Sequence, residues 1–158
     1  MSRAAGILLP ITSLPSKYGI GCFSKSAYDF VDWLKQAGQT YWQILPLCPT
    51  SYGDSPYQSF STFAGNPYFI DLEALCEQGL LTVKECKSYE WGDSITQVDY
   101  EMLHKSRYPL LHKAFAQFQK KIPGDYAQFC KEQEDWLDDY ALFMALKDSH
   151  DGEPWSKW

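Results

Sequence analysis

The sequence predicts an α/β fold that begins with a strand–helix–strand unit and continues as a series of helices. Residues 6–9 and 41–45 are short apolar or aromatic runs, each closed by a proline, and an amphipathic helical pattern lies between them. Beyond residue 70, apolar residues recur at helical spacing. A strand, a helix and a strand within about 40 residues form a βαβ unit, whose strands we expect to be parallel with a right-handed crossover.

The first predicted strand is apolar throughout. Residues 6–9 carry no polar side chain and end at Pro10, a pattern typical of a strand buried on both faces. The stretch 12–22 then holds a proline and two glycines, which predicts a turn-rich loop.

The helix of the unit has signals at both of its ends. Ser24 or Ser26 can cap its N-terminus, because a serine oxygen accepts a hydrogen bond from an N–H of the first turn. Gly38 is a typical C-terminal stop. The second strand, residues 41–45, follows directly. Apolar residues at helical spacing form the face that we expect to meet the core: Ala27, Phe30, Val31 and Leu34.

Two short helices are predicted just after residue 70. Asp71 can cap the first of them, and Gly79 can end it. Thr82 and Glu85 match the S/T-x-x-E capping box, which predicts that the second helix starts there.

Two further helical patterns cover residues 111–118 and 137–144, and Gly152 follows the second of them. Pro109 is expected at a kink or in the first turn of the earlier helix. These apolar stripes are best interpreted as packing surface rather than as a cofactor site.

Composition excludes several classes of function. The chain has 158 residues, 16% of them aromatic, and a net charge of −6, so it can bury a core but lacks the clustered basic residues that nucleic acid binding needs. No apolar run approaches a membrane span, and the start of the chain lacks a secretory signal. The odd number of cysteines, without a C-x-x-C pair, predicts reduced thiols in a cytoplasmic protein: Cys22, Cys48, Cys76, Cys86 and Cys130.

The chain divides near residue 70. Residues 1–70 hold four basic and three acidic side chains and are rich in glycine, proline, serine and aromatics. Residues 71–158 hold 10 basic and 17 acidic side chains. We therefore predict two parts, 1–70 and an acidic helical part at 71–158.

The long loop at residues 48–68 is the segment most suited to binding. It leaves the carboxyl end of a parallel strand, where α/β folds place their ligand sites. Its neutral hydroxyls and amides, with Asp54 as the single charge, suit a sugar, whose C–H faces stack on aromatic rings. The alternative, that these rings only pack beneath the loop, is equally compatible with the composition. The aromatic residues are Tyr52, Tyr57, Phe60, Phe63 and Tyr68.

Other candidate sites are weaker. His104 and His112 have no cysteine at ligand spacing, so surface or core histidines are a better interpretation than a metal site. The acidic run within residues 132–139 is most simply the solvated face of a helix. Cys48 is a conceivable nucleophile, but a packed thiol fits it better.

Eight segments of the chain carry a resemblance to a known family: GILLPITSLP (6–15), YWQILPL (41–47), GDSPYQSFS (53–61), AGNPY (64–68), IDL (70–72), WL (136–137), DYALFMALK (139–147) and PW (154–155). They resemble the N-terminal region of the 4-α-glucanotransferases, also called amylomaltases or disproportionating enzymes, of the α-amylase clan. The resemblance extends through essentially the whole chain, and its loop motif is long and specific.

The resemblance implies the first βαβ of a TIM-type (β/α)8 barrel, then a mostly helical inserted subdomain, with the barrel incomplete in this chain. It implies a retaining double displacement that moves a segment of an α-1,4-glucan to the 4-hydroxyl of glucose or another glucan, without a cofactor. The partners would be maltooligosaccharides and starch or glycogen-type glucans.

The resemblance also implies three substrate-binding residues. Tyr57 matches a tyrosine that lines the donor site beside the cleaved bond, and Ser55 matches a neighbouring sugar contact. Tyr52 matches an aromatic residue of a second glucan-binding groove. For Asp54, Gln58 and Asn66 we infer only roles in shaping the loop.

No residue of this chain matches the family's catalytic carboxylates, which retaining transfer requires. A full barrel takes about 250 residues, so 158 residues cannot close one. We therefore expect a fragment of a longer enzyme that is inactive alone. The rival hypotheses are a non-catalytic α-glucan-binding module and a hydrolase of the same clan.

Overall fold

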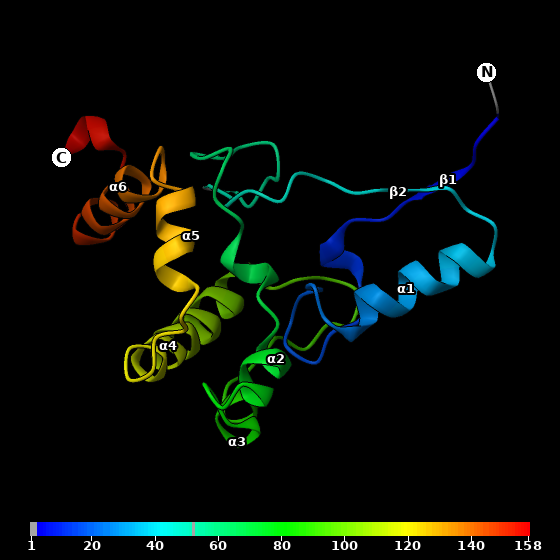
Figure 1. Ribbon diagram of the computed structural model, residues 1–158, viewed down its shortest axis with the longest axis horizontal. Coiled ribbons are helices and arrows are strands. Elements are labelled where there is room, and N and C mark those ends of the chain that lie inside the picture. The colour runs from blue at the N-terminus through cyan, green and yellow to red at the C-terminus, as the bar shows by residue number, and fades with distance from the viewer. Residues whose placement is uncertain (1–2, 52) are drawn as a thin grey trace.

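The computed structural model describes residues 3–51 and 53–158. Figure 1 shows an elongated arrangement, with the N-terminal strands and first helix at one end and the last helix at the other. The strands are β1 (Gly6–Leu8) and β2 (Tyr41–Gln43), and the helices are η1 (Ile11–Ser13), α1 (Lys25–Gln36), η2 (Pro67–Phe69), α2 (Leu72–Glu77), α3 (Val83–Lys87), α4 (Tyr100–Phe118), α5 (Tyr126–Glu132), α6 (Leu137–Ser149) and η3 (Trp155–Lys157).

The predicted βαβ unit is confirmed. β1 and β2 pair in parallel with Gly6 opposite Tyr41, and α1 connects them. Gly6 is required by this pairing, because a Cβ atom there would lie 2.6 Å from the carbonyl oxygen of Tyr41. The Ser24 side chain caps α1 by accepting a hydrogen bond from the Ser26 N–H. Gly38 ends the helix with a φ of 70°.

The prediction that the first strand is buried on both faces is wrong for this structure. Ile7 and Leu8 are 36% and 57% exposed, and Val31 on α1 is 48% exposed. The physical reason is that the described sheet has two strands. The apolar cluster around Ile11 and Ala27 packs beside them, and two strands with one helix do not enclose both faces.

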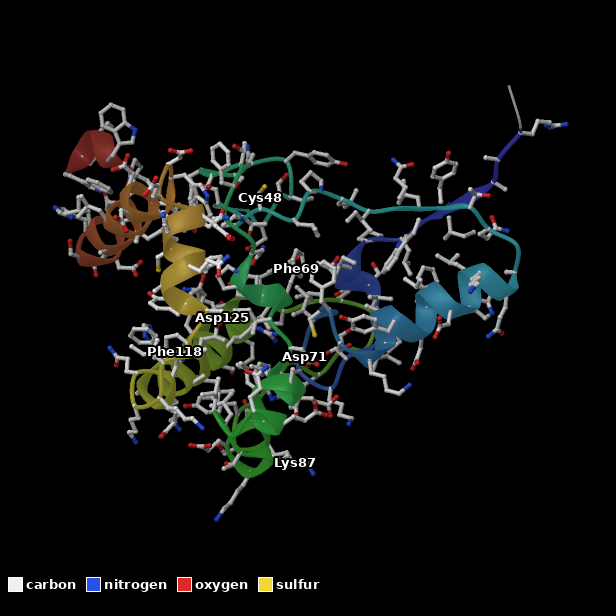
Figure 2. All side chains as sticks on the ribbon, in the orientation of Figure 1. Cys48, Phe69, Asp71, Lys87, Phe118 and Asp125 are labelled. Atoms are coloured by element: carbon white, nitrogen blue, oxygen red, sulfur yellow. The ribbon has the colours of Figure 1, made fainter. Side chains whose placement is uncertain are left out.

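The signals after residue 70 are confirmed at the level of single hydrogen bonds. The Asp71 carboxylate, at the start of α2 (Figure 2), accepts from the Glu73 N–H at 3.0 Å. Thr82 and Glu85 form both bonds of the capping box at the start of α3. Gly79 has a φ of 74°, the left-handed conformation that ends α2.

The longer helices are confirmed with one correction and one omission. The pattern at 137–144 forms α6, and the pattern at 111–118 is the second half of α4. Pro109 is not in the first turn, since α4 begins at Tyr100 with Asp99 as its cap. Because proline has no backbone N–H, the Lys105 carbonyl lacks the donor that it would normally have within the helix. α5 forms at residues for which the sequence pattern predicts no helix.

The main core lies where α4 packs against α2 and α3. Leu72, Cys86 and Leu110 are 0% exposed and belong to one apolar cluster. Among residues 3–51 and 53–158, no helix is long and apolar enough to cross a membrane.

Arg107 is a buried charge at the junction of three segments. Its side chain is 0% exposed, and its guanidinium donates to the carbonyl oxygens of Tyr18 and Ile70. Burial lowers its pKa from the ordinary value for arginine. Within the described residues its Nε has no hydrogen-bond partner. Arg107 therefore ties the turn after η1 and the end of the long loop to α4.

Candidate functional site

The long loop after β2 is anchored to the chain that precedes it. The Asn66 N–H donates to the Leu47 carbonyl at 2.8 Å, and the Ser51 N–H donates to the Gln58 carbonyl at 3.0 Å. The Asn66 side chain, 8% exposed, accepts from the Tyr68 N–H at 2.9 Å and so caps η2. These bonds fix both ends of the loop's exposed middle.

Within the loop, serine oxygens set the local turns. The Ser55 hydroxyl accepts from the Tyr57 N–H at 3.3 Å. The Ser61 hydroxyl accepts from the N–H groups of Phe63 and Ala64 at 3.2 and 3.1 Å. Such short-range bonds let a polar loop hold one conformation without a helix or a strand.

Of the three residues inferred to shape the loop, Asn66 bonds the local backbone through its side chain as expected, whereas Asp54 and Gln58 make other bonds. Asp54 has a φ of 52°, and its carboxylate accepts from the Thr50 hydroxyl at 3.4 Å. Asn66 acts through its side chain, as described above. Gln58 acts through its backbone, because its N–H donates to the Ser55 carbonyl at 3.1 Å.

Three of the loop's aromatic rings pack against helices. Tyr68 is 6% exposed and contacts Tyr100 and Tyr108, with ring centroids 6.2 and 6.0 Å apart. Burial raises the pKa of its hydroxyl well above the ordinary value. Phe60 and Phe63 pack against α6 or the residue before it. The ring centroids of Phe60 and Phe143 are 6.0 Å apart, and those of Phe63 and Trp136 are 5.9 Å apart.

Tyr57 is 74% exposed, and Phe63 is 71% exposed although its ring stacks on Trp136. The Tyr57 ring and hydroxyl differ in making no hydrogen bond or ring contact among residues 3–51 and 53–158. Ser55 is half-buried, and its oxygen already holds the Tyr57 backbone. Tyr52, the third predicted binding residue, lies outside the described residues. The described rings of the loop therefore divide into three that pack on another aromatic ring and Tyr57, whose ring has no such partner and is open to a ligand.

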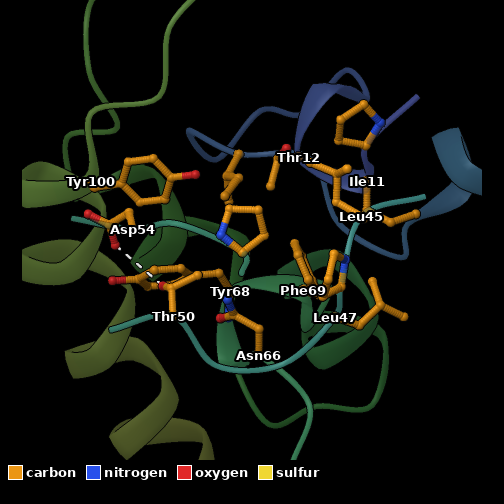
Figure 3. Close-up of a pocket in the computed structure, with 14 residues that line it drawn as sticks. Ile11, Thr12, Leu45, Leu47, Thr50, Asp54, Asn66, Tyr68, Phe69 and Tyr100 are labelled. Carbon is orange, nitrogen blue, oxygen red and sulfur yellow. Dashed lines mark hydrogen bonds between the residues drawn. The ribbon is translucent and has the colours of Figure 1, made fainter. Parts of the chain in front are cut away.

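A pocket of about 170 Å³ lies beneath the loop (Figure 3). On one side it is lined by Asp54, Tyr68 and Tyr100, and on the other by apolar residues such as Ile11 and Leu45. It is smaller than the few hundred cubic ångströms typical of a ligand site, and Tyr57 does not line it. Tyr100 carries no sign of its own in the sequence, although Asp99, which caps α4 directly in front of it, marks the helix start that places it here.

The weaker candidates do not assemble into a site. Among the described residues no group of three or more His, Cys, Asp or Glu side chains could hold a metal ion. His104 is exposed and packs its ring on Tyr108, with centroids 4.6 Å apart. Cys48 is half-buried, and the five acidic residues within 132–139 are exposed.

Replacing Asn66 by alanine is expected to loosen the loop and lower the free energy of unfolding by about 1 kcal/mol, as loss of a capping side chain does. Urea denaturation would measure the change. Gln58→Ala is the matched control, because that exposed side chain lies on the same loop and its shaping contact comes from the backbone. Equal stability of the Asn66 and Gln58 variants would contradict the anchoring role.

Comparison with known proteins extends over nearly the whole chain. The family model described as 4-alpha-glucanotransferase matches residues 9–158. The chain belongs to the 4-alpha-glucanotransferase family.

Individual relatives agree. The 4-alpha-glucanotransferase of Clostridium butyricum is 51% identical over 148 residues, which are 94% of this chain and 30% of that protein. The Thermus thermophilus 4-alpha-glucanotransferase is 48% identical over 162 residues, covering 100% of this chain and 31% of its own length.

A solved structure, the amylomaltase from Streptococcus agalactiae in complex with acarbose, superposes with a TM-score of 0.94 at 42% identity. The match covers 99% of this chain and 32% of that one. The chain therefore spans about a third of the length of these family members and shares their mixed α/β fold over that part.

Proposed function

We propose that the protein containing this chain is a 4-α-glucanotransferase, which moves a segment of an α-1,4-glucan to the 4-hydroxyl of glucose or another glucan by a retaining double displacement. Family membership over residues 9–158 is the observation that carries this proposal. The substrates would be maltooligosaccharides and starch or glycogen-type glucans. The acarbose bound to the Streptococcus agalactiae amylomaltase supports a ligand of this chemistry.

In this proposal β1, α1 and β2 are the first βαβ unit of a TIM-type barrel, and residues 71–158 form a helical insertion. The exposure of Leu8 and Val31 supports this barrel assignment. Apolar side chains on a parallel strand and on the helix that covers it are normally enclosed by neighbouring barrel segments. The barrel segments outside this chain would supply the nucleophile and the acid, which lie about 5 Å apart in retaining enzymes.

This chain would contribute substrate binding. Tyr57 presents an exposed ring against which the apolar face of a glucose unit can lie, and Ser55 holds the Tyr57 backbone in place. Tyr52 would serve a second glucan-binding groove. We propose that the reaction needs no cofactor and takes place in the cytoplasm, the compartment that the five free cysteines favour.

Incubating the intact protein with maltotriose tests the proposal. A transferase produces glucose together with oligomers longer than maltotriose, because the released segment is passed to another sugar. A hydrolase of the same clan yields only shorter sugars. Retention of maltotriose on the protein without any product would identify a glucan-binding module instead. Chromatography of the products separates these three results.

A further inference from the structure

Two cysteine thiols, one on α2 and one on α3, lie side by side, away from the long loop at residues 48–68. The Sγ atom of Cys76, in the last turn of α2, is 3.7 Å from the Sγ atom of Cys86, in α3. Both cysteines are free thiols. Their separation is that of two sulfurs in van der Waals contact, without a covalent bond.

The chain between the two cysteines brings them together by local structure. Gly79 turns the chain at a φ of 74°, and the Leu80 N–H donates back to the Leu75 carbonyl at 2.9 Å. The capping box at Thr82 then starts α3, while Leu81, 4% exposed, holds the connection in the core. The contact between the thiols is thus built by the short connection from α2 to α3, and the core cluster that Cys86 shares with Leu110 of α4 holds it in place.

The two thiols differ in environment. Cys86 is 0% exposed and packed among Leu72, Leu81 and Leu110, whereas Cys76 is half-buried. Burial, with Cys76 as the next cause, raises the pKa of the Cys86 thiol to about 12. Cys76 is therefore the thiol that an oxidant reaches first, and Cys86 is positioned to react with the product.

We propose that Cys76 and Cys86 are a reversible oxidation site that closes to a disulfide when the protein meets a peroxide. The Cys76 thiol releases its proton, and the thiolate attacks hydrogen peroxide, which breaks the O–O bond and gives a sulfenic acid and a hydroxide ion; the released proton converts the hydroxide to water. The Cys86 sulfur then attacks the Cys76 sulfur, which forms the S–S bond and expels a second water. Two thiols and one peroxide give one disulfide and two waters.

The geometry demands little movement. A disulfide holds its sulfur atoms about 2.05 Å apart, so the 3.7 Å contact must shorten by roughly 1.6 Å. A side-chain rotation of Cys76, at the end of a helix of six residues, can supply part of this movement. The closed bond would join α2 to α3 and constrain the unfolded chain between them.

Oxidation followed by mapping of the thiols tests the proposal. The intact protein is treated with hydrogen peroxide, the remaining thiols are alkylated, and the product is cleaved after glutamate. Cleavage at Glu73, Glu77, Glu85 and Glu90 places the two cysteines on the separate peptides 74–77 and 86–90. The expected result is a linked pair of these two peptides, 2 Da lighter than their sum, which dithiothreitol separates. The melting temperature of the oxidised protein should rise by on the order of 5 °C.

Matched variants make the result decisive. Cys76→Ser should remove both the linked peptides and the rise in melting temperature. Cys130→Ser, a change on α5, should keep both. Three results would overturn the proposal. The first is that both thiols can still be alkylated at a peroxide dose that has already oxidised methionine. The others are a sulfinic acid at Cys76 in place of the disulfide, and a disulfide between Cys76 and another cysteine.

Discussion

Replacing Tyr57 by alanine is expected to lower glucan transfer at least about tenfold, mainly in kcat/KM, without changing the stability of the protein. The ring is 74% exposed, so its removal takes no packing from the core. Losing an aromatic contact worth about 1.4 kcal/mol in the transition state corresponds to a tenfold loss in rate. Initial rates of glucose release from maltotriose, together with the midpoint of urea denaturation, measure the two quantities.

Two further variants give this experiment its controls. Tyr28→Ala removes a ring that is 71% exposed on α1, outside the loop, and is expected to leave kcat/KM unchanged. Tyr57→Phe keeps the ring and removes the hydroxyl, so it separates stacking from hydrogen bonding. Full turnover by Tyr57→Ala would remove Tyr57 from the donor site and direct attention to the pocket beside Tyr100.

Of the variants named for this protein, Arg107→Ala should lose the most stability, with a decrease of about 3 kcal/mol or more in the free energy of unfolding. The change removes a charged donor from two carbonyl oxygens, those of Tyr18 and Ile70, and leaves a cavity in the core. Urea denaturation followed by tryptophan fluorescence measures the effect, because Trp91 packs its ring against Tyr18.

Graded substitutions keep this prediction testable if the alanine variant does not fold. Arg107→Lys retains the charge with fewer donors and should be intermediate in stability. Lys105→Ala, an exposed change on the same helix, should leave the urea midpoint almost unchanged. If Arg107→Met were as stable as the parent, burying the charge would cost as much as its hydrogen bonds contribute, and the anchoring role would be lost.

The elements that could be predicted are those whose signals lie within a few residues. The Ser24 cap, the stop at Gly38 and the capping box of Thr82 and Glu85 are all bonds between near neighbours in sequence. For α4 the sequence pattern indicates only residues 111–118, with Pro109 at a kink or in the first turn. The helix begins at Tyr100 and continues through Pro109, because tertiary packing overrides the local signal of a proline.

The candidate site could be predicted only in part. Its location after β2 and the sugar-like chemistry of the loop follow from the sequence. Which aromatic rings pack and which stay open does not, because Tyr68 meets Tyr100 and Phe63 meets Trp136 across long stretches of chain. Exposure does not separate Tyr57 from Phe63, which is 71% exposed. Tyr57 is distinguished by having no ring partner among the described residues, a property that only the folded chain defines.

By itself the sequence determined the βαβ order, the caps of the short helices and membership of the glucanotransferase family, since each depends on local residue patterns or on a long motif. The tertiary structure alone decided the exposure of β1, the burial of Arg107 and the contact between Cys76 and Cys86. The physical reason is that burial and side-chain contact are set by which segments surround a residue. In this chain those segments are often tens of residues away, as Ile70 is from Arg107.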